Sequence, residues 1–335
     1  MSDARTVSSG VAATLVAADP YDPRLVAGVA EGFRAALRDG SAAAMQVPPR
    51  VTVTAAAGAG GPAGGAVRCI SMPAVSLHHD LYINKVATIA DAGSPGATVT
   101  AVVPMFSARD GRYLGALDGA AVTALKCAAV TALVTDRCAV ADVSALAIIG
   151  AGAQALAQFA GVSAVRQPAE IRIHSRTRRS AERFAADVRS RSAALGRRPA
   201  VRVCDSIEEA CAGADVVGTT TTSATPLPLG PLPEHVHVNC MGAHTTDSRE
   251  VSRELLGSSV VFVEDRPTAI AEAGALHADA HELDELDRPD LGDLRWRRTV
   301  FSSIGCAWLD LLTCAHLRAD SIPVWARAAE LDMEE

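Results

Sequence analysis

A glycine-rich segment in the middle of the chain has the residue types and spacing of a nucleotide-binding loop. It reads Gly-Ala-Gly-Ala-Gln-Ala over 150–155, after an apolar run and at the start of a predicted helix. The first glycine of such a loop makes a tight turn, the second lets the backbone approach a pyrophosphate, and the free N–H groups of the helix bind phosphate. The segment therefore predicts a dinucleotide site whose contacts are Gly150, Gly152, Ala153 and Gln154.

A cluster of arginines and hydroxyl groups follows the next predicted strand, over 171–174. Sites for NAD usually place an acidic side chain there, which binds the ribose 2′-hydroxyl. This strand instead leads into Ser-Arg-Thr-Arg-Arg over 175–179, and guanidinium groups suit a 2′-phosphate. The alternative is a basic, solvated start of a helix. We expect NADP(H) as the preferred cofactor, with NAD(H) possible, and contacts from Ser175, Arg176, Thr177 and Arg179.

Hydroxyl-bearing and small residues follow two later predicted strands, which end near residues 219 and 239. The carboxyl ends of parallel strands meet at one edge of a sheet, and dinucleotides bind at that edge. We therefore expect these residues to reach the ribose and the nicotinamide. The expected contacts are Thr220, Thr221, Thr222, Met241 and Gly242.

The pattern of predicted elements changes near residue 118. After it, short apolar strands alternate with helices, which is typical of a parallel sheet covered on both faces. Before it, the pattern predicts one helix and a mostly antiparallel sheet, with a hairpin turn at Asp110-Gly111. A long helix over 118–137 lies at the change, and the tail over 308–318 is helical again. The early elements are a helix over 23–39 and strands over 50–54, 67–72, 81–89, 99–106 and 112–116.

The composition is that of a globular protein of two domains. The 335 residues are 49% hydrophobic, with 31 basic and 38 acidic side chains and a net charge of −7. An acidic balance without a basic stripe argues against nucleic-acid binding. The first residues lack the apolar core of a signal peptide, and no apolar run is long enough to span a membrane. We therefore expect a cytoplasmic protein that binds neither nucleic acid nor membrane.

Metal chemistry is not indicated. The eight cysteines are scattered, without Cys-x-x-Cys pairs or histidines at ligand spacing, so we expect mostly buried, reduced thiols and no metal site. His78 and His79 beside Asp80 resemble a metal pair, but without further ligands a polar turn is favoured. A Gly/Ala-rich segment over 57–66 could hold a phosphate, although its place between strands favours a surface loop.

A series of short segments, in order along the chain, matches the motifs of one protein family. They are Met72-Pro73-Ala74, Lys85, Asp118-Gly119, 123–126, 150–154, 219–226, 239–250 and 299–305. With these the sequence resembles the ornithine cyclodeaminase/mu-crystallin family over about residues 45–320. The resemblance implies an α/β fold in which a doubly wound Rossmann domain, 123–307, is inserted into an α+β domain with a mostly antiparallel sheet. That second domain, 1–122 plus 308–335, would bind the substrate and form a homodimer.

The resemblance implies that three cationic side chains bind the carboxylate of the substrate. The matching positions are Arg50, Lys85 and Lys126, and Lys126 stands where the family has an arginine. A small anion held beside a hydride carrier needs two or three fixed cations, so this set suits that chemistry. Structural alternatives remain: an exposed strand residue for Arg50, an ion pair within the protein for Lys85, and a pair with Asp118 or a solvated position for Lys126.

The resemblance also indicates candidate proton donors. Cyclodeaminases of the family carry a catalytic aspartate where this chain has His244. A histidine could protonate a nitrogen as hydride reaches the adjacent carbon, so Lys85 and His244 are the expected catalytic residues; the alternative for His244 is a loop residue stacked on the nicotinamide. Ser303 and Gly305 match the segment that contacts the nicotinamide, and Asp310 either supports the site or caps a helix.

These features together predict an NADPH-dependent reductase of the C=N bond of a small α-imino acid, a ketimine or cyclic imine carboxylate, or the reverse amino-acid dehydrogenase. One alternative is an ornithine- or lysine-type cyclodeaminase with bound NAD(H), which the histidine at position 244 disfavours. An alternative of another class is a non-catalytic NADPH-binding protein like the crystallin of the family. The expected partners are a small imino or amino acid and a second copy of the chain.

Overall fold

The computed structural model describes residues 19–55, 67–90, 99–242, 246 and 249–320. Contacts within the chain divide it into two compact units. Unit 1 comprises residues 1–22, 35–126 and 306–335, and unit 2 comprises residues 23–34 and 127–305. Segments from both ends of the chain therefore contribute to unit 1, while the domain limits expected from the sequence stay a prediction.

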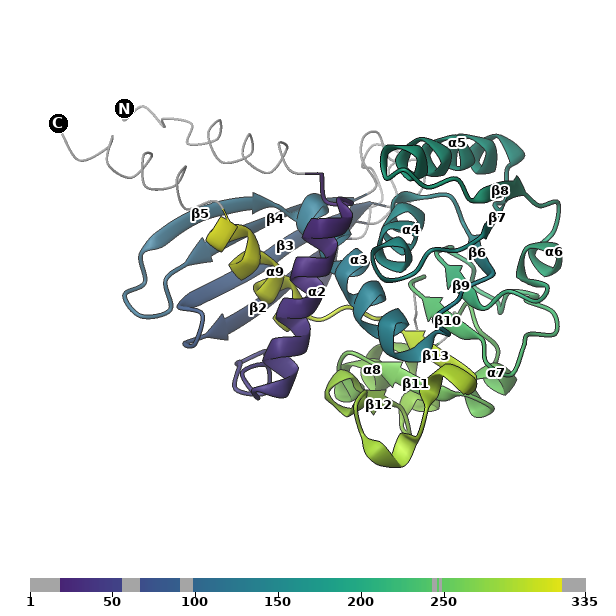
Figure 1. The fold of residues 1–335 in the computed structure, drawn as a ribbon. Coiled ribbons are helices and arrows are strands. Elements are labelled where there is room, and N and C mark those ends of the chain that lie inside the picture. Colours follow the sequence, from purple (N-terminus) through teal and green to yellow (C-terminus); the bar gives the residue numbers. More distant parts are fainter. Residues whose placement is uncertain (1–18, 56–66, 91–98, 243–245, 247–248, 321–335) are drawn as a thin grey trace. The chain divides into compact units, whose positions relative to one another are not determined.

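The described residues of unit 1 form a five-stranded antiparallel sheet whose strands lie in sequence order (Figure 1). The predicted hairpin at Asp110-Gly111 is confirmed, since Gly111 has a φ of 75° and the strands on either side pair with each other. One helix, α9 (Ala307–Asp320), packs on β2 and β3. The strands are β1 (Val51–Ala55), β2 (Val67–Ser76), β3 (Leu81–Ala90), β4 (Val99–Phe106) and β5 (Tyr113–Asp118).

The two faces of this antiparallel sheet differ in exposure. Side chains alternate between the faces along each strand, and the inner face, which includes Met72, Ile83 and Val103, is buried. On the outer face, four valines of three strands remain between 41% and 60% exposed. These are Val51 and Val53 of β1, Val86 of β3 and Val102 of β4, and we call them the outer valines.

A parallel sheet forms the centre of unit 2, with the strand order β12-β11-β13-β10-β9-β6-β7-β8. Taken in the opposite direction, the strands β8-β7-β6-β9-β10-β13 correspond to the order 3-2-1-4-5-6 of a dinucleotide-binding sheet, in which β6 is strand 1. The predicted doubly wound Rossmann fold is therefore confirmed. The strands are β6 (Ala145–Ile149), β7 (Glu170–His174), β8 (Ala200–Val203), β9 (Val216–Thr219), β10 (His237–Cys240), β11 (Val260–Val263), β12 (His281–Glu282) and β13 (Thr299–Ser302).

Helices on the two faces of this sheet create two separate hydrophobic cores (Figure 1). One core includes Phe159 and Phe184 from the helices α4 (Ala153–Val165) and α5 (Arg178–Ala194). Strands between two such layers are buried on both sides, which is why they are short, continuous apolar runs in the sequence. The opposite core contains residues of α6 (Ile207–Cys211), α7 (Arg253–Gly257) and α8 (Arg266–Ala273).

The elements between β11 and α9 were not predicted from the sequence. β12 has only two residues, and β13 carries a threonine and a serine at its ends, so neither has a clear apolar pattern. Short 3₁₀ helices accompany them: one precedes β12 at Ala275–His277, and three lie between β12 and β13 at Leu283–Glu285, Pro289–Leu291 and Leu294–Trp296.

Two long helices precede the parallel sheet. α2 (Pro23–Arg38) begins at a proline and is followed by Gly40 with a φ of 77°, as these two residues predict. α3 (Gly119–Cys138) continues from unit 1 into unit 2. Contrary to expectation, the length and composition of α3 would allow it to cross a membrane. However, 78% of its apolar 18-residue stretch is buried inside the protein. Such burial is typical of a core helix in a globular protein.

A fully buried polar network joins the middle of the parallel sheet to α3. His237 Nδ1 lies 2.9 Å from Thr299 Oγ1 and Nε2 lies 3.2 Å from Asn239 Oδ1, while Asn239 donates to Thr135 Oγ1 at 3.0 Å. The amide oxygen accepts, so Nε2 carries the proton and the neutral ring satisfies both partners. Burial lowers the pKa of His237 to about 3.

We expect this network to weaken the protein at mildly acidic pH. The unfolded chain binds a proton at His237 below about pH 6.5, whereas the folded protein binds it only near pH 3, so protonation favours unfolding throughout this window. Between pH 7 and pH 5 this residue should lower the free energy of unfolding by about 2 kcal/mol. Urea denaturation of the wild type and of His237→Gln at both pH values measures the effect, and an equal fall in both proteins would contradict it.

Candidate functional site

The turn after β6 requires glycine at its first position. Gly150 has a φ of 112°, and a Cβ atom there would lie 2.4 Å from Thr220 Oγ1. The backbone is fixed on both sides, since Gly150 N donates to His174 O at 2.8 Å and Thr220 N donates to Ile149 O at 2.8 Å. The ends of β6, β7 and β9 therefore meet at this turn. Only glycine, which has no Cβ atom, fits this close approach of the loop after β9 to the end of β6.

The start of α4 has the open polar groups that a dinucleotide phosphate needs. Gly152 precedes the helix without a side-chain cap, and a Cβ atom on it would meet nothing within 4 Å. The Oε1 atom of Gln154 is buried and has no hydrogen-bond partner among the described residues. Free N–H groups at a helix start and an open approach to the backbone fit a bound pyrophosphate, while the unused acceptor of Gln154 fits a donor such as a ribose hydroxyl. Gly150, Gly152, Ala153 and Gln154 are the residues that would hold its pyrophosphate.

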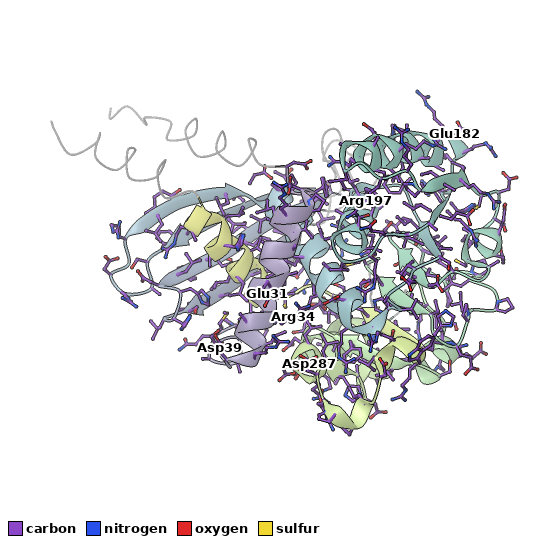
Figure 2. The ribbon with its side chains drawn as sticks, in the orientation of Figure 1. Glu31, Arg34, Asp39, Glu182, Arg197 and Asp287 are labelled. Carbon is purple, nitrogen blue, oxygen red and sulfur yellow. The ribbon has the colours of Figure 1, made fainter. Side chains whose placement is uncertain are left out.

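The arginines after β7 have different surroundings. Arg176 and Arg179 are exposed, and neither has a hydrogen bond or ion pair with any residue that the structure describes. Arg178 forms ion pairs with Glu182 at 3.0 Å and with Asp205 at 2.6 Å. Glu182 lies on α5 (Figure 2). The sequence prediction found no acid close to this strand end and so missed Asp205, which follows β8.

The hydroxyl groups beside these arginines are only partly available. Thr177 Oγ1 accepts a hydrogen bond from Ser180 N and so caps α5, whereas Ser175 is partly exposed in the turn before it. The structure therefore brings Ser175, Arg176 and Arg179 to the end of β7. Their contact with a cofactor stays a prediction.

A buried glutamate that the sequence prediction missed joins the ends of β9 and β10. Glu250 is 0% exposed. It accepts hydrogen bonds from Thr219 Oγ1 at 2.8 Å, from Gly242 N at 2.7 Å and from Thr221 N, and Cys240 Sγ lies 3.5 Å away. A Cβ atom on Gly242 would lie 2.1 Å from the carboxyl carbon of Glu250. Glu250 therefore fixes the backbone around the predicted contacts Thr221 and Gly242.

A second buried glutamate, Glu264, holds the end of β13 in the same way. Glu264 follows β11 and is 4% exposed. It accepts hydrogen bonds from Ser303 Oγ, from Ile304 N at 3.0 Å and from Gly305 N at 3.1 Å. The side chain of Ser303 and the N–H of Gly305, both expected at the nicotinamide, are thus bonded to the protein. An acid directly after an apolar strand was the only sequence signal for this residue.

The remaining predicted cofactor contacts lie at the same edge of the parallel sheet. Thr220, Thr221 and Met241 are partly exposed there, and Thr222 is exposed. Their contacts with a nucleotide stay predictions. The candidate proton donor His244 and the Gly/Ala-rich segment over 57–66 lie outside the described residues.

In unit 1, Lys85 forms a buried ion pair. Lys85 lies on β3 and is 8% exposed, and its Nζ is 2.6 Å from Oδ2 of the fully buried Asp310 on α9. The contact has the distance of an ion pair but not the angles of a hydrogen bond, and Asp310 makes no capping hydrogen bond with any described residue. An ammonium group has three donors, so the pair fixes Lys85 and leaves capacity for a second anion.

Arg50 directly precedes β1, and Lys85 lies on the inner face of the antiparallel sheet. Val51, the first residue of β1, pairs with Ser71, and the neighbouring Met72 pairs with Lys85. Arg50 itself is partly exposed and lies outside the paired strand. The structure therefore places Lys85 on the inner face, and the position of Arg50 beside the same substrate stays a prediction.

The third predicted cation, Lys126, is in the interior of the protein. It lies on α3 and is 3% exposed. Its alternative partner Asp118 is exposed and accepts a hydrogen bond from Ala121 N at 2.7 Å, which starts α3. The part of Lys126 in substrate binding stays a prediction.

The remaining polar clusters are structural. The turn predicted around His79 is confirmed, because His79 Nδ1 lies 2.9 Å from Ser76 Oγ and Asp80 closes the turn with a φ of 46°. Seven cysteines are buried, Cys69 is exposed, and all are free thiols. No group of three histidine, cysteine, aspartate or glutamate side chains suited to a metal ion occurs in the described part of the chain.

Comparison with known proteins places the chain in a family. Residues 18–318 match the ornithine cyclodeaminase/mu-crystallin family. The ketimine reductase mu-crystallin of Macropus fuliginosus is 32% identical over 262 residues, which cover 75% of this chain and 79% of that protein. The Delta(1)-pyrroline-2-carboxylate reductase of Bacillus cereus is 28% identical over 264 residues, which cover 73% of this chain and 79% of that protein.

The fold is also that of a solved structure. The Delta(1)-pyrroline-2-carboxylate reductase of Thermococcus litoralis, in complex with NADH and L-proline, superposes with a TM-score of 0.78 at 21% identity. The match covers 93% of this chain and 96% of that one. With the glycine loop, the strand order and the sequence match in agreement, this chain is a member of the ornithine cyclodeaminase/mu-crystallin family.

Proposed function

We propose that this protein is a nicotinamide-dependent reductase of the C=N bond of a small α-imino acid, or catalyses the reverse oxidation of an α-amino acid. Its relatives include a ketimine reductase and a pyrroline-2-carboxylate reductase. The observation that carries the proposal is the buried pair of Lys85 and Asp310. An ammonium group that a protein keeps in its interior, fixed by one carboxylate, is suited to bind a substrate anion and to donate a proton.

The cationic residues of unit 1 have separate tasks in this proposal. Arg50, Lys85 and Lys126 hold the substrate carboxylate, so that the imine carbon is presented in one orientation. Lys126 offers a point charge where the family has a planar guanidinium, so it binds a single oxygen of that carboxylate. Lys85 or His244 donates the proton that the imine nitrogen needs when the carbon receives hydride. A bound nicotinamide dinucleotide would supply that hydride.

The preferred cofactor in this proposal is NADP(H). Arg176 and Arg179 are exposed beside the end of β7 and are not engaged by any described acidic residue. Two such guanidinium groups suit the charge of a 2′-phosphate. Arg178 is neutralised by Glu182 and Asp205, so it contributes less to the binding of this phosphate.

We further propose that two copies of the chain associate through the outer face of the antiparallel sheet. The outer valines are 41–60% exposed, and exposed apolar side chains gathered on one face of a sheet are typical of an interface. A second copy suits this face because a two-fold axis pairs the same apolar surface with itself. The substrate-binding and dimerisation domain would then be 1–122 plus 308–335, with the Rossmann domain over 123–307 inserted.

Two other functions remain as outcomes of the tests. The family includes ornithine cyclodeaminases, which release ammonia from a diamino acid without net consumption of cofactor. A crystallin-like protein would bind the dinucleotide without turnover. The histidine at position 244, in place of the cyclodeaminase aspartate, favours the reductase over the first of these.

The proposed function predicts consumption of reduced cofactor with an imine acid. Purified protein with NADPH and a panel of cyclic and linear ketimine acids should oxidise NADPH, followed at the nicotinamide absorbance. Lys85→Met should lower kcat/KM by about a hundredfold or more, because a buried charged group at the substrate is lost. Ammonia release from ornithine or lysine without net cofactor change would instead identify a cyclodeaminase, and binding without either reaction a crystallin-like protein.

The arginines predict the cofactor preference. Replacing both Arg176 and Arg179 by alanine should raise KM for NADPH about tenfold or more and leave KM for NADH nearly unchanged, because two charge-assisted hydrogen bonds to the phosphate are lost. Arg178→Ala is the matched control, since Asp205 and Glu182 already neutralise that side chain. An equal change for both cofactors would contradict the assignment of these residues to the 2′-phosphate.

The outer valines predict the oligomeric state. The wild type should have the mass of a dimer in light scattering, and Val53→Lys should produce monomers because it buries a charge in the interface. Leu195→Lys, which replaces a 40% exposed leucine of unit 2, should leave the dimer intact. A monomeric wild type, or a Val53→Lys dimer of unchanged affinity, would exclude this interface.

A further inference from the structure

Glu250 and Glu264 are buried carboxylates without a cationic partner. They are 0% and 4% exposed, and neither forms an ion pair with a lysine, arginine or histidine in the described part of the chain. Their hydrogen bonds come from neutral hydroxyl, thiol and backbone N–H donors. Two backbone N–H groups donate to each carboxylate, and because such groups can only donate, these contacts suit an ionised carboxylate.

Such an arrangement differs from the usual treatment of charge in a protein interior. A buried charge is costly unless it is paired, and most buried acids pair with a cation. Asp310 follows that rule, because Lys85 lies 2.6 Å from it. Glu250 and Glu264 have no such partner among the described residues, and the groups that donate to them bring no opposite charge to the ends of β9, β10 and β13.

The strand order relates this charge to one half of the proposed dinucleotide. The pyrophosphate binds at the turn after β6, and the adenosine half lies toward the ends of β7 and β8. The nicotinamide half therefore lies on the other side, toward the ends of β9 and β10. These are the ends that Glu250 joins, and Glu264 holds the neighbouring end of β13.

We infer that Glu250 and Glu264 make the site bind the oxidised nicotinamide more tightly than the reduced one. The inference rests on the proposed function. In imine reduction the hydride moves from the nicotinamide to the imine carbon, a proton goes to the nitrogen, and the nicotinamide ring changes from neutral to positively charged. Fixed negative charges in a region of low dielectric stabilise that new positive charge without reorganisation.

This electrostatic role has a consequence for the direction of the reaction. Tighter binding of the oxidised cofactor favours its formation on the protein, and amine formation accompanies it. The two carboxylates would thus shift the equilibrium on the protein toward reduction of the imine and away from oxidation of the amino acid.

The test compares the affinities of the purified full-length protein for NADP⁺ and NADPH, each measured by titration calorimetry without substrate. Glu250→Gln should raise the ratio of Kd for NADP⁺ to Kd for NADPH by about tenfold, which is the effect of removing one nearby charge. Glu264→Gln should shift the ratio in the same direction, and it provides the same test should Glu250→Gln fail to fold.

Two control variants separate charge from loop geometry. Thr219→Val removes the hydroxyl that donates to Glu250 at 2.8 Å but keeps the carboxylate, and Glu250→Asp keeps the charge on a shorter side chain. Both should change the two Kd values by similar factors and leave their ratio near that of the wild type.

The outcomes distinguish this inference from the function on which it rests. An unchanged ratio in both glutamine variants, or an equal shift of the ratio in Thr219→Val, would overturn the electrostatic role and leave the reductase intact. Failure of the wild-type protein to bind either form of the cofactor would overturn the proposed function itself.

Discussion

The close approach of β6 to the start of the loop after β9 is the constraint on which the rest of unit 2 depends. A Cβ atom at Gly150 would lie 2.4 Å from Thr220 Oγ1, so these two strand ends can be neighbours only with glycine at that position. Once they are neighbours, the parallel order brings the ends of β9, β10 and β13 to one edge of the sheet. Glu250 and Glu264 then have donors on several segments within reach. The dinucleotide loop and the two carboxylate contacts are therefore parts of one arrangement.

The buried charges of the two units are stabilised in different ways. Lys85 and Asp310 neutralise each other, and removal of one partner of such a pair typically costs about 3–5 kcal/mol because the other charge is left alone. Glu250 and Glu264 are stabilised by hydrogen bonds that bring no opposite charge. The first arrangement fixes the position of an ammonium group. The second leaves a net charge that can act on a ligand.

The sequence allowed most elements to be predicted, because local signals specify them. The Asp110-Gly111 turn, the proline and glycine that bound α2, and the apolar runs of β6, β9 and β11 each depend on a few adjacent residues. The strand β13 gave no such signal, since its burial comes from its neighbours β10 and β11 rather than from its own pattern.

The partners of the site residues could not be predicted, because they come from distant parts of the chain. Lys85 was predicted to be a cation of the site, but its partner Asp310 lies on the described helix α9, far away in the sequence. Asp205 pairs with Arg178 from the end of another strand. The donors to Glu250 lie in two separate segments of sequence, one with Thr219 and Thr221 and the other with Gly242. A sequence shows which side chains can carry charge. The fold decides which of those charges are cancelled.

Charges that bind a ligand differ from charges that favour one direction of the proposed reaction. A carboxylate and a phosphate keep their charges from substrate to product, so cations proposed only to bind them, such as Arg50 and Arg176, would stabilise both states equally and contribute uniform binding. The nicotinamide ring is the part of the proposed reactants whose charge differs between the two forms of the cofactor. Fixed charges near that ring can therefore favour one form over the other, and Glu250 and Glu264 are buried carboxylates at that end of the sheet that have no cationic partner among the described residues. The net charge of −7 describes neither role, because both depend on where single charges are buried and left without a partner.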